Sequence, residues 1–298
     1  MTTHGHIPVL LDEVLDILDA AQPGLYIDGT LGAAGHAFEI LKKNPGASLI
    51  GLDRDETSLR AASERLESFA DRIVLYNADF RQLPDLDIDF ASVKGYLFDL
   101  GISSRQLDDP VRGFSHSLEG PLDMRMDARE KTTAFKILDT SSESRLAEIF
   151  RNYGELNQAR KLAREIAGRR KFRKFETTTQ LRLLVEEVCR WHPQKGRIHP
   201  AAKVFQALRI EVNRELEGLS EFLDELFDLM APGARIAVIS FHSLEDRIAK
   251  RAFLGASSGE NAPPRLKILT RKPVTPSKEE VSRNPRSRSA KMRAAERI

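Results

Sequence analysis

Short apolar segments that end in acidic or turn residues recur along the first hundred residues of the chain, and one more follows much later. Each is short enough for a strand that is buried on both faces. The stretches after the first two segments place apolar residues three and four positions apart, which is typical of helices. This alternation predicts an α/β fold with a mainly parallel sheet. The five expected strands are "LYIDG" (25–29), "SLIGLDRD" (48–55), "RIVLYNADF" (72–80), "KGYLFDLG" (94–101) and "RIAVISF" (235–241).

The alternation stops after residue 101, because about 130 residues separate the fourth expected strand from the fifth. This is far longer than an ordinary crossover connection. We therefore expect an inserted all-helical domain over residues 109–198, which would recognise the substrate. Residues 1–108 and 199–298 would together form the α/β domain.

Two patterns follow the expected insertion. From Ala201 a long helical pattern resumes, with an apolar stripe that runs on to Met230. The tail then offers two final strands, "RLKILTRKPVTP" and "RSAKMRAAERI", joined by a polar link. The second of these could equally be helical or frayed.

The first expected strand runs into a glycine-rich turn and a helix, a geometry that nucleotide-binding folds place beneath a ligand. Gly29, Gly32 and Gly35 have the spacing G-x-x-G-x-x-G. Dinucleotide sites instead use G-x-G-x-x-G, and Leu31 stands where their second glycine would let the backbone approach a pyrophosphate. S-adenosylmethionine carries an amino group and a sulfonium, and it suits a strand-end acid such as Asp28 beside a permissive loop. A plain tight connection between strand and helix is the alternative.

Acidic residues also end the second, third and fourth expected strands, so these side chains should meet at one edge of the sheet. Asp53 could accept both hydroxyls of a ribose, or it could cap the next helix, a role that Asp55 fills more naturally. Asp79 could reach an adenine amino group, with Phe80 either stacked on the ring or simply buried in the core. Asp99 is the catalytic candidate, because an amine that attacks a methyl sulfonium needs an acceptor for its proton. The alternative for Asp99 is an ordinary solvated strand end.

The bulk composition is that of a soluble globular protein, with 298 residues, 41% hydrophobic and 30% charged. The only cysteine is Cys189, which excludes an internal disulfide framework. The first residues lack the basic flank and apolar run of a secretory signal, and no apolar run reaches the roughly 20 residues that cross a bilayer. We therefore expect a cytoplasmic protein without a membrane span.

The formal net charge of +2 conceals an uneven distribution. Residues 1–100 have a balance of −9, whereas residues 261–298 have a balance of +8. Residues 160–174 hold eight cations, with Phe172 and Phe175 interleaved, which favours contact with a polyanion such as RNA. A solvated helix face is the alternative. The candidate RNA-binding residues are Arg169, Arg170, Lys171, Arg173 and Lys174.

Two further segments have both a functional and a structural interpretation. The loop "GPLDMRMD" (120–127) could fold over the site, or Arg125 could tie Asp123 and Asp127 together while the methionines pack beneath. His242, just after the fifth strand, could face a target base, although a helix cap by Ser243 explains that segment more plainly.

We expect no metal site. The seven histidines do not offer four ligands at a known zinc spacing, either in "HGH" (4–6) or in "WHPQKGRIHP" (191–200). An acid pair such as that of the 120–127 loop does not by itself establish one.

Six segments form a recognisable set: "HIPVLLDEVL" (6–15), "DGTLGAAGHA" (28–37), "FDLGISSRQLDDPVRGFS" (98–115), "GPLDMRMD" (120–127), "FQALRIEVNREL" (205–216) and "ISFHSLEDRIAKR" (239–251). Together they closely resemble the bacterial 16S ribosomal RNA cytosine-N4 methyltransferases of the RsmH/MraW type. The similarity spans nearly the whole chain. "GPLDMRMD" and "SFHSLEDR" are specific to that family, while the glycine loop is shared by many methyltransferases.

The resemblance implies a class I methyltransferase fold, Rossmann-like with a mainly parallel seven-stranded sheet, interrupted by a helical domain that helps to hold RNA. The methyl donor would be S-adenosyl-L-methionine. The substrate would be the exocyclic N4 of cytidine 1402 in the decoding region of 16S ribosomal RNA, within the small ribosomal subunit.

The cofactor contacts that the resemblance implies lie partly where the residue pattern already points. His36 and Gln106 come from the resemblance alone, and Ala34 stands where the family often has a glycine, a departure that adds one methyl group. The full set is Ala34, Gly35, His36, Asp53, Phe80, Asp99 and Gln106.

The acceptor for the proton of the target amine is less clear from the sequence. The fourth strand ends in "DLGISS" and lacks the [DNS]-P-P-[YFW] motif with which many DNA amino-methyltransferases hold the amine. Asp99, or a backbone carbonyl beside it, is the expected acceptor. Because N4 lies inside a base pair when cytosine is stacked, the target base should be unpaired or flipped. The sequence leaves open whether naked RNA or the assembled subunit is the substrate, and whether the chain forms a homodimer.

Two other functions fit parts of the pattern. A nicotinamide-dependent oxidoreductase would use the strand–turn–helix unit, but the second glycine and a Tyr-x-x-x-Lys motif are both missing. A non-catalytic RNA-binding assembly factor would use the basic run and keep only a vestigial nucleotide pocket. Acids at all four strand ends argue against such decay.

Overall fold

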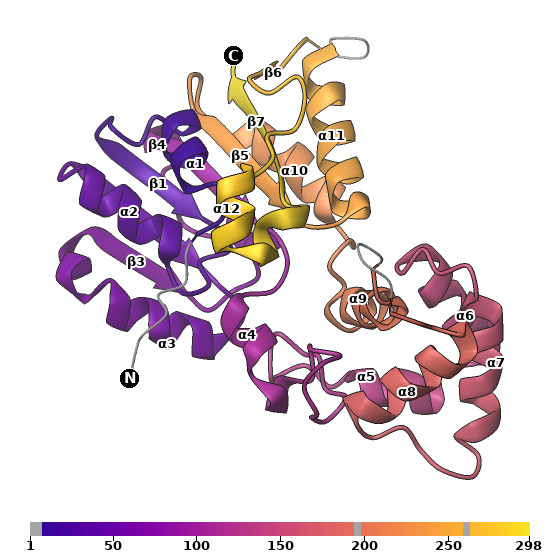
Figure 1. Ribbon diagram of the computed structural model, residues 1–298. Coiled ribbons are helices and arrows are strands. Elements are labelled where there is room, and N and C mark those ends of the chain that lie inside the picture. Colours follow the sequence, from indigo (N-terminus) through magenta and orange to yellow (C-terminus); the bar gives the residue numbers. More distant parts are fainter. Residues whose placement is uncertain (1–7, 194–197, 259–262) are drawn as a thin grey trace. The chain divides into compact units, whose positions relative to one another are not determined.

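The computed structural model describes residues 8–193, 198–258 and 263–298, and these residues form two compact units (Figure 1). The first unit combines the chain up to Gly101 with Leu216–Ile298, and the second unit is Ile102–Glu215. None of the helices in the described ranges combines the length and the apolar character that crossing a bilayer requires.

The first unit is built on a seven-stranded sheet with the strand order β3-β2-β1-β4-β5-β7-β6. Strands β3 to β5 in that order are parallel, while β7 runs antiparallel to both of its neighbours. The expected α/β fold with a mainly parallel sheet is therefore confirmed. The strands are β1 (Gly24–Asp28), β2 (Ala47–Leu52), β3 (Ile73–Tyr76), β4 (Val93–Asp99), β5 (Arg235–Ser240), β6 (Leu266–Ile268) and β7 (Lys291–Arg297).

Each face of this sheet has its own hydrophobic core. Leu97 and Ile239 belong to one core, and Phe98 and Val238 belong to the other. Successive residues of a strand point to opposite faces, which explains why the central strands are apolar without interruption. The helices of this unit are α1 (Leu11–Ile17), α2 (Gly35–Lys43), α3 (Glu56–Arg65), α10 (Leu219–Leu229), α11 (Ser243–Ser258) and α12 (Lys278–Arg283).

The tail of the chain contributes the two strands that its sequence predicts. Strand β7 pairs with β5 and with β6, so the helical alternative for this segment is wrong. The polar link between β6 and β7 is not plain loop, because it contains α12 and the 3₁₀ helix Pro285–Ser289.

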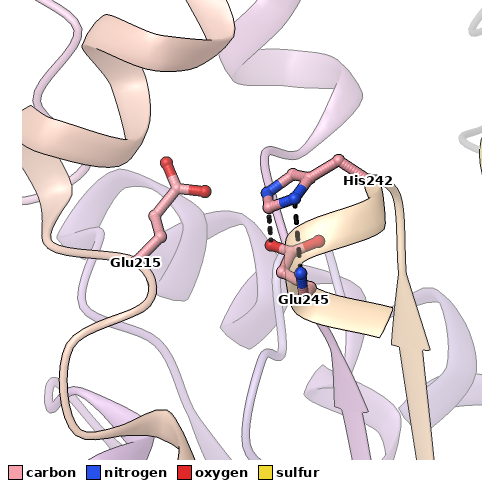
Figure 2. A group of neighbouring side chains, drawn as sticks. All are labelled: Glu215, His242 and Glu245. Atoms are coloured by element: carbon pink, nitrogen blue, oxygen red, sulfur yellow. Dashed lines mark hydrogen bonds and ion pairs between the residues drawn. The ribbon is translucent and has the colours of Figure 1, made fainter. Parts of the chain in front are cut away.

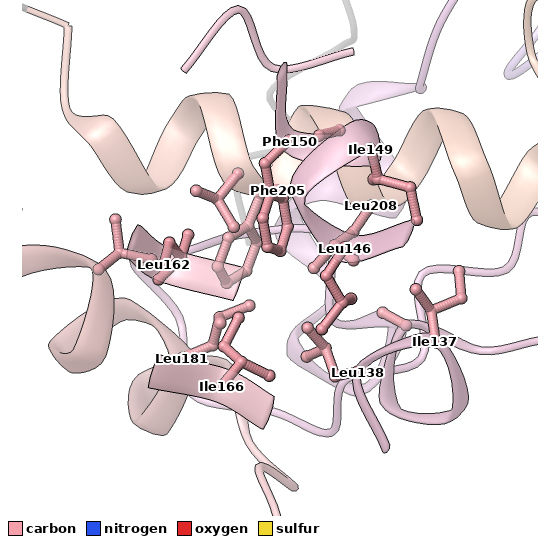
Figure 3. Close-up of a cluster of buried hydrophobic side chains, with 14 of the residues drawn as sticks. Ile137, Leu138, Leu146, Ile149, Phe150, Leu162, Ile166, Leu181, Phe205 and Leu208 are labelled. Carbon is pink, nitrogen blue, oxygen red and sulfur yellow. The ribbon is translucent and has the colours of Figure 1, made fainter. Parts of the chain in front are cut away.

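The second unit consists of helices and loops, and its helices share one core (Figure 3). Phe150, Leu162, Leu181 and Leu208 come from four different helices, and all four are fully buried. Burial of such side chains contributes about 1.5–3 kcal/mol each. The helices are α4 (Ser104–Asp108), α5 (Ala134–Thr140), α6 (Glu143–Asn152), α7 (Ala159–Arg169), α8 (Thr178–Cys189) and α9 (Pro200–Asn213).

This unit is wider than the insertion expected over residues 109–198. On one side, Ile102 and Leu107 pack against its core, and on the other side α9 supplies Val204 and Leu208 to it. The flanking helices α4 and α9 are thus held to the second unit by apolar contacts. The expected boundaries were placed at turn residues, which give no information on such contacts.

The apolar stripe between Ala201 and Met230 does not form one helix. Helix α9 ends at Asn213, where Arg214 adopts the left-handed conformation with φ 49°, and α10 begins after Gly218, where φ is 68°. The two halves of the stripe therefore belong to different units.

Candidate functional site

Three carboxyl groups of the first unit lie at the ends of neighbouring strands. Asp28 ends β1, Asp53 directly follows β2, and Asp99 ends β4, and these three strands are adjacent in the sheet. Carboxyl ends of parallel strands meet at one edge of a sheet, as the sequence predicts. The charge of Asp53 acts on Asp28, and the charge of Asp28 acts on Asp99, so the three groups form one electrostatic cluster.

All three carboxyl groups have raised pKa values. Burial is the main cause in each case, and it raises the pKa of Asp28 to about 7, of Asp53 to about 6 and of Asp99 to about 8. The charges of Asp28 and Glu245 raise the pKa of Asp99 further. A cation placed among these groups would stabilise their ionised forms. The site is therefore suited to a positively charged ligand.

Asp99 holds one carboxylate oxygen ready for a ligand. Its Oδ1 is buried and has no hydrogen-bond partner within the described part of the chain, and its Oδ2 lies 4.0 Å from Nδ1 of His36. The backbone is held in place because the Asp99 amide donates to the Thr30 hydroxyl at 2.5 Å. An unsatisfied buried acceptor costs about 1–3 kcal/mol, which a donor on a ligand would recover.

His36 is a buried residue of the first turn of α2. Its Nε2 lies 2.9 Å from the carbonyl oxygen of Val9. In the neutral tautomer that donates to this carbonyl, Nδ1 carries no proton and faces Asp99 as an acceptor. The structure thus places His36, which the residue pattern alone did not single out, beside the catalytic candidate.

Asp53 is bound to the glycine loop and does not cap a helix. Its Oδ2 accepts from the Gly32 amide at 2.8 Å, and its Oδ1 accepts from the Asp55 amide at 2.8 Å. Gly32 has φ 52°, a conformation that favours glycine. Asp55 instead caps α3 by accepting from the Thr57 amide at 3.0 Å, as expected. Each oxygen of Asp53 keeps a lone pair that a ribose hydroxyl could use.

Ala34 and Gly35 shape the turn from which α2 begins. Ala34 is fully buried and has φ 56°, so a residue with a Cβ atom stands in the left-handed region here. A Cβ atom on Gly35 would lie 2.6 Å from Cγ of Pro8. Gly35 is therefore required by the packing of Pro8 against this turn, whatever the loop binds.

Asp79 and Phe80, at the third strand end, both have partners inside the unit. Asp79 caps the 3₁₀ helix Phe80–Asp85 and accepts two hydrogen bonds from the Arg81 guanidinium, at 2.7 and 2.6 Å. These bonds hold the pKa of Asp79 below its ordinary value, in spite of burial. Phe80 packs edge-on against Phe98 and Phe222, with ring centroids 5.6 and 5.0 Å away, and it remains partly exposed. The core interpretation of Phe80 thus has direct support, and its contact with a cofactor stays a prediction.

Gln106 belongs to the second unit. It forms a capping box with Ser103 at the start of α4, because its Oε1 accepts from the Ser103 amide at 3.0 Å and its own amide donates to the Ser103 hydroxyl. Its side chain is buried.

Part of the basic run after residue 160 is paired within the second unit. Arg169 makes two hydrogen bonds to Glu187 and one to Glu165, and Arg170 donates to the carbonyl of Leu138 at 2.5 Å. Arg169 therefore links α7 to α8, and Arg170 links the end of α7 to α5. Arg169 remains exposed to solvent and Arg170 is half-buried, so RNA contact by these two arginines stays a prediction, with the solvated face as its alternative.

The remaining cations of the run differ from one another. Lys174 donates to Asp139 at 2.9 Å. Lys171 and Arg173 are exposed, and neither side chain has a hydrogen-bond or ion-pair partner in the described residues. Of the five candidate RNA-binding residues, only these two keep their charge entirely available.

The methionines of the 120–127 loop pack as the structural alternative expects, but its two acids have different arginine partners, because Asp127 accepts hydrogen bonds from Arg129. A role of the loop over the site stays a prediction. Arg125 makes two hydrogen bonds to Asp123, at 2.8 and 2.7 Å, while Met124 and Met126 are buried in the core of the second unit. Asn213 holds the loop to the end of α9, since its amide donates to the Met124 carbonyl and accepts from the Met126 amide, both at 2.7 Å. Asn213 belongs to the recognised segment 205–216, but nothing in the sequence indicated its partners, which are almost ninety positions away.

The half-buried His242 and the buried Glu245 form a pair at the start of α11 (Figure 2). Nε2 of His242 lies 3.2 Å from Oε1 of Glu245, and the Glu245 amide points at Nδ1 of His242 at 3.4 Å. His242 therefore occupies the cap position that was expected for Ser243, which is already the first helical residue. Glu245 was missed, although a histidine and a glutamate three positions apart at a helix start are a recognisable signal.

His4 and His6 lie outside the described residues, and so do residues 194–197 of the second histidine segment. His199 is described, and its Nε2 lies 3.2 Å from Glu186.

Comparison with known proteins identifies the family. The model described as the MraW methylase family matches residues 3–298, nearly the whole chain. The chain belongs to this family. Its members are S-adenosylmethionine-dependent methyltransferases, so the cofactor expected from the glycine loop is confirmed, and the oxidoreductase alternative is wrong. The resemblance found in the six segments is confirmed as well, and so is the mainly parallel seven-stranded sheet that it implies.

Curated relatives of the family cover the chain almost from end to end. Two proteins named ribosomal RNA small subunit methyltransferase H are similar to it, one from Carboxydothermus hydrogenoformans (44% identical, 99% of this chain and 98% of the relative) and one from Oleidesulfovibrio alaskensis (46% identical, 99% and 95%). A solved structure of a putative methyltransferase from Streptococcus mutans in complex with SAH covers 98% of this chain and 99% of its own, with a TM-score of 0.43 at 11% identity. A TM-score this low adds no information on the fold beyond the strand order of the sheet.

Proposed function

We propose that this protein transfers a methyl group from S-adenosylmethionine to the exocyclic N4 of cytidine 1402 in the decoding region of 16S ribosomal RNA. The observation that carries the enzymatic part is the cluster of Asp28, Asp53 and Asp99, three carboxyl groups at adjacent strand ends whose surroundings raise their pKa values. The names of the relatives support ribosomal RNA of the small subunit as the substrate. The choice of N4 and of the cytidine rests on the motif resemblance.

The residues of the first unit fit the donor. S-adenosylmethionine supplies a methyl group on a sulfonium, and it also carries an ammonium, a carboxylate and an adenosine. We assign its cationic part to Asp99 and His36, because Oδ1 of Asp99 is a buried acceptor in need of a donor. Asp53 would accept the ribose hydroxyls. Further contacts would come from Ala34 and Gly35 of the turn, from Phe80 at the adenine ring and from Gln106.

Asp99 would also serve the amine of the target base. N4 attacks the methyl carbon, the bond from carbon to sulfur breaks, and N4 must lose one proton. An ionised Asp99 carboxylate can accept a hydrogen bond from N4 and then this proton. The cationic donor beside Asp99 would favour the ionised carboxylate that this role requires.

The second unit, which contains the expected insertion 109–198, would hold the RNA. Its free cations Lys171 and Arg173 can neutralise phosphates without reading the sequence. The target base must leave its pair before N4 can react. We place the reaction in the cytoplasm, on RNA within the small ribosomal subunit.

The decisive experiment is methyl transfer from labelled donor to ribosomal RNA, followed by nucleoside mapping of the product. Naked 16S RNA and assembled small subunits should be compared, together with the Asp99→Asn variant as the inactive control. N4-methylcytidine at a single position is the expected product. A label on carbon or ribose, or label incorporation by Asp99→Asn at the normal rate, would contradict the assignment.

A further inference from the structure

The connection between α7 and α8, residues 170–177, carries an unusual side chain. Phe172 is 93% exposed, the highest value among the large apolar residues that are exposed in the described chain. Full burial of a phenylalanine is worth about 1.5–3 kcal/mol relative to exposure, and folding recovers almost none of it here. The ring is thus available to a binding partner.

Phe172 is exposed on a well-held turn. The amides of Phe172 and Arg173 both donate to the Arg169 carbonyl at 3.0 Å. Before the turn, Arg170 is bound to the Leu138 carbonyl, and after it Lys174 is bound to Asp139. The two ends of the turn are therefore bound to α5, and these contacts hold the backbone that carries the exposed ring.

The neighbours of Phe172 specify the chemistry of the partner. Lys171 and Arg173 flank it and have no side-chain partner in the part of the chain that the structure describes. An exposed ring between two free cations suits a ligand that presents a flat π face and negative charges a few ångströms apart. Single-stranded nucleic acid has both, in its unpaired bases and its phosphates.

We propose that Phe172 stacks on an unpaired base of the RNA substrate, while Lys171 and Arg173 contact the phosphates on either side of it. The proposal rests on the proposed function for the identity of the RNA. It assigns separate roles within the basic run, because Arg169 and Arg170 would support the turn and Lys171, Phe172 and Arg173 would make the contact.

The first test measures the affinity for an unpaired RNA that contains the decoding-region sequence. Phe172→Ala and Phe172→Leu should weaken binding by about 5- to 150-fold, whereas Phe172→Tyr should stay within about twofold. The variant Leu183→Ala is a matched control, because Leu183 is an exposed apolar residue of α8 in the same unit. If Phe172→Leu binds as tightly as the unchanged protein, the contact is apolar without stacking, and the proposal is wrong.

The dependence of affinity on salt separates the cations from the ring. Lys171→Ala and Arg173→Ala should each reduce the salt slope by about one, while Phe172→Ala should weaken binding and leave the slope unchanged. Lys131→Ala, at another exposed cation of the second unit without a partner in the described residues, should change neither. An equal loss of slope in Phe172→Ala would mean that the turn is disturbed, and it would count against stacking.

A spectroscopic measurement reports the stacking directly. The chain has one tryptophan, Trp191, so Phe172→Trp in a Trp191→Phe background carries a single tryptophan, at the turn, whose emission can be excited selectively. RNA should quench its emission, and vesicles of anionic lipid should not. Emission that responds to vesicles but not to RNA would overturn the proposal in favour of a membrane contact.

These outcomes remain separate from those of the proposed function. Loss of Phe172 dependence with methyl transfer intact would remove the stacking contact alone. Absence of methyl transfer in the unchanged protein would contradict the enzymatic assignment and leave the binding measurements valid.

Discussion

The two units handle their charged side chains in opposite ways. In the first unit, Asp28, Asp53 and Asp99 are gathered at one sheet edge, where burial and the charges of nearby carboxyl groups raise their pKa values. In the second unit, most of the candidate cations are on the surface and paired, and only Lys171 and Arg173 are free. A count of charges would rank the basic run as the stronger site. The burial and pairing of each charge lead to a different conclusion. The acidic cluster is where ionisation is most costly, and within the basic run only the unpaired cations are fully available to a ligand.

The largest expected effect comes from Asp99. Asp99→Asn keeps the shape of the side chain and removes the proton acceptor, so the methyl transfer rate at saturating donor should fall by about 10²- to 10⁴-fold. Single-turnover transfer of labelled methyl groups measures this rate. A fall of less than tenfold would show that another group, such as a backbone carbonyl, accepts the proton.

Asp53 and Asp55 provide a matched pair of neighbouring carboxylates. Asp53→Ala should weaken donor binding by roughly 10- to 150-fold, since a charge-assisted hydrogen bond is worth about 1.5–3 kcal/mol. Asp55→Ala removes a helix cap and should cost about 1 kcal/mol of stability with donor affinity kept. Calorimetry of donor binding and a denaturant titration of each variant separate the two roles. RNA affinity should stay the same in both variants, and unchanged donor affinity in Asp53→Ala would remove Asp53 from the site.

The acidic cluster also predicts a pH dependence of the reaction. Because the pKa of Asp99 is raised to about 8, its ionised fraction, and with it the methyl transfer rate at low donor, should rise roughly fivefold from pH 7 to pH 8. Glu245→Gln removes one of the like charges that act on Asp99, so it should move the midpoint of this profile to lower pH. A pH profile that is flat across this range would exclude Asp99 as the titrating group.

The same shift has a consequence for the protein without ligand. A carboxyl group whose pKa is higher in the folded state than its ordinary value of 3.8 stabilises the fold below that value, and this contribution is lost as the pH rises through about 8. The free energy of unfolding should therefore fall between pH 4 and pH 8, and less so in Asp99→Asn. Urea titrations at several pH values measure the difference.

The smallest expected effects concern the paired cations. Arg169→Ala should change RNA affinity by no more than about twofold, because its guanidinium is engaged by Glu165 and Glu187. Combined replacement of Arg169, Arg170 and Lys171 by alanine should weaken RNA binding mainly through Lys171. If Arg169→Ala alone reduces the salt slope as much as Lys171→Ala does, the distinction between paired and free cations is wrong.

The sequence was most informative where the signal was local. Strands β1 to β5 and their terminal acids could be placed, because a strand buried on both faces needs an unbroken apolar run and the carboxyl ends of parallel strands coincide. The roles of Asp53 and Asp55 could be separated by their distance from the next helix. Contacts between distant residues could not be found in this way. Asn213 meets the loop at Met124 and Met126, and Arg170 meets Leu138, and neither pairing leaves a pattern along the chain.

The position of β7 has a consequence for how the first unit is made. Strand β6 is synthesised first, yet its pairing partner in the sheet is β7, which also covers the outer side of β5. Until β7 has emerged, the backbone groups along that side of β5 are open to any other extended chain. A truncation that removes Lys291–Arg297 should therefore do more than shorten the sheet. It would leave the outer edge of β5 unpaired and able to bind extended segments of other chains, so the shortened protein should accumulate in inclusion bodies.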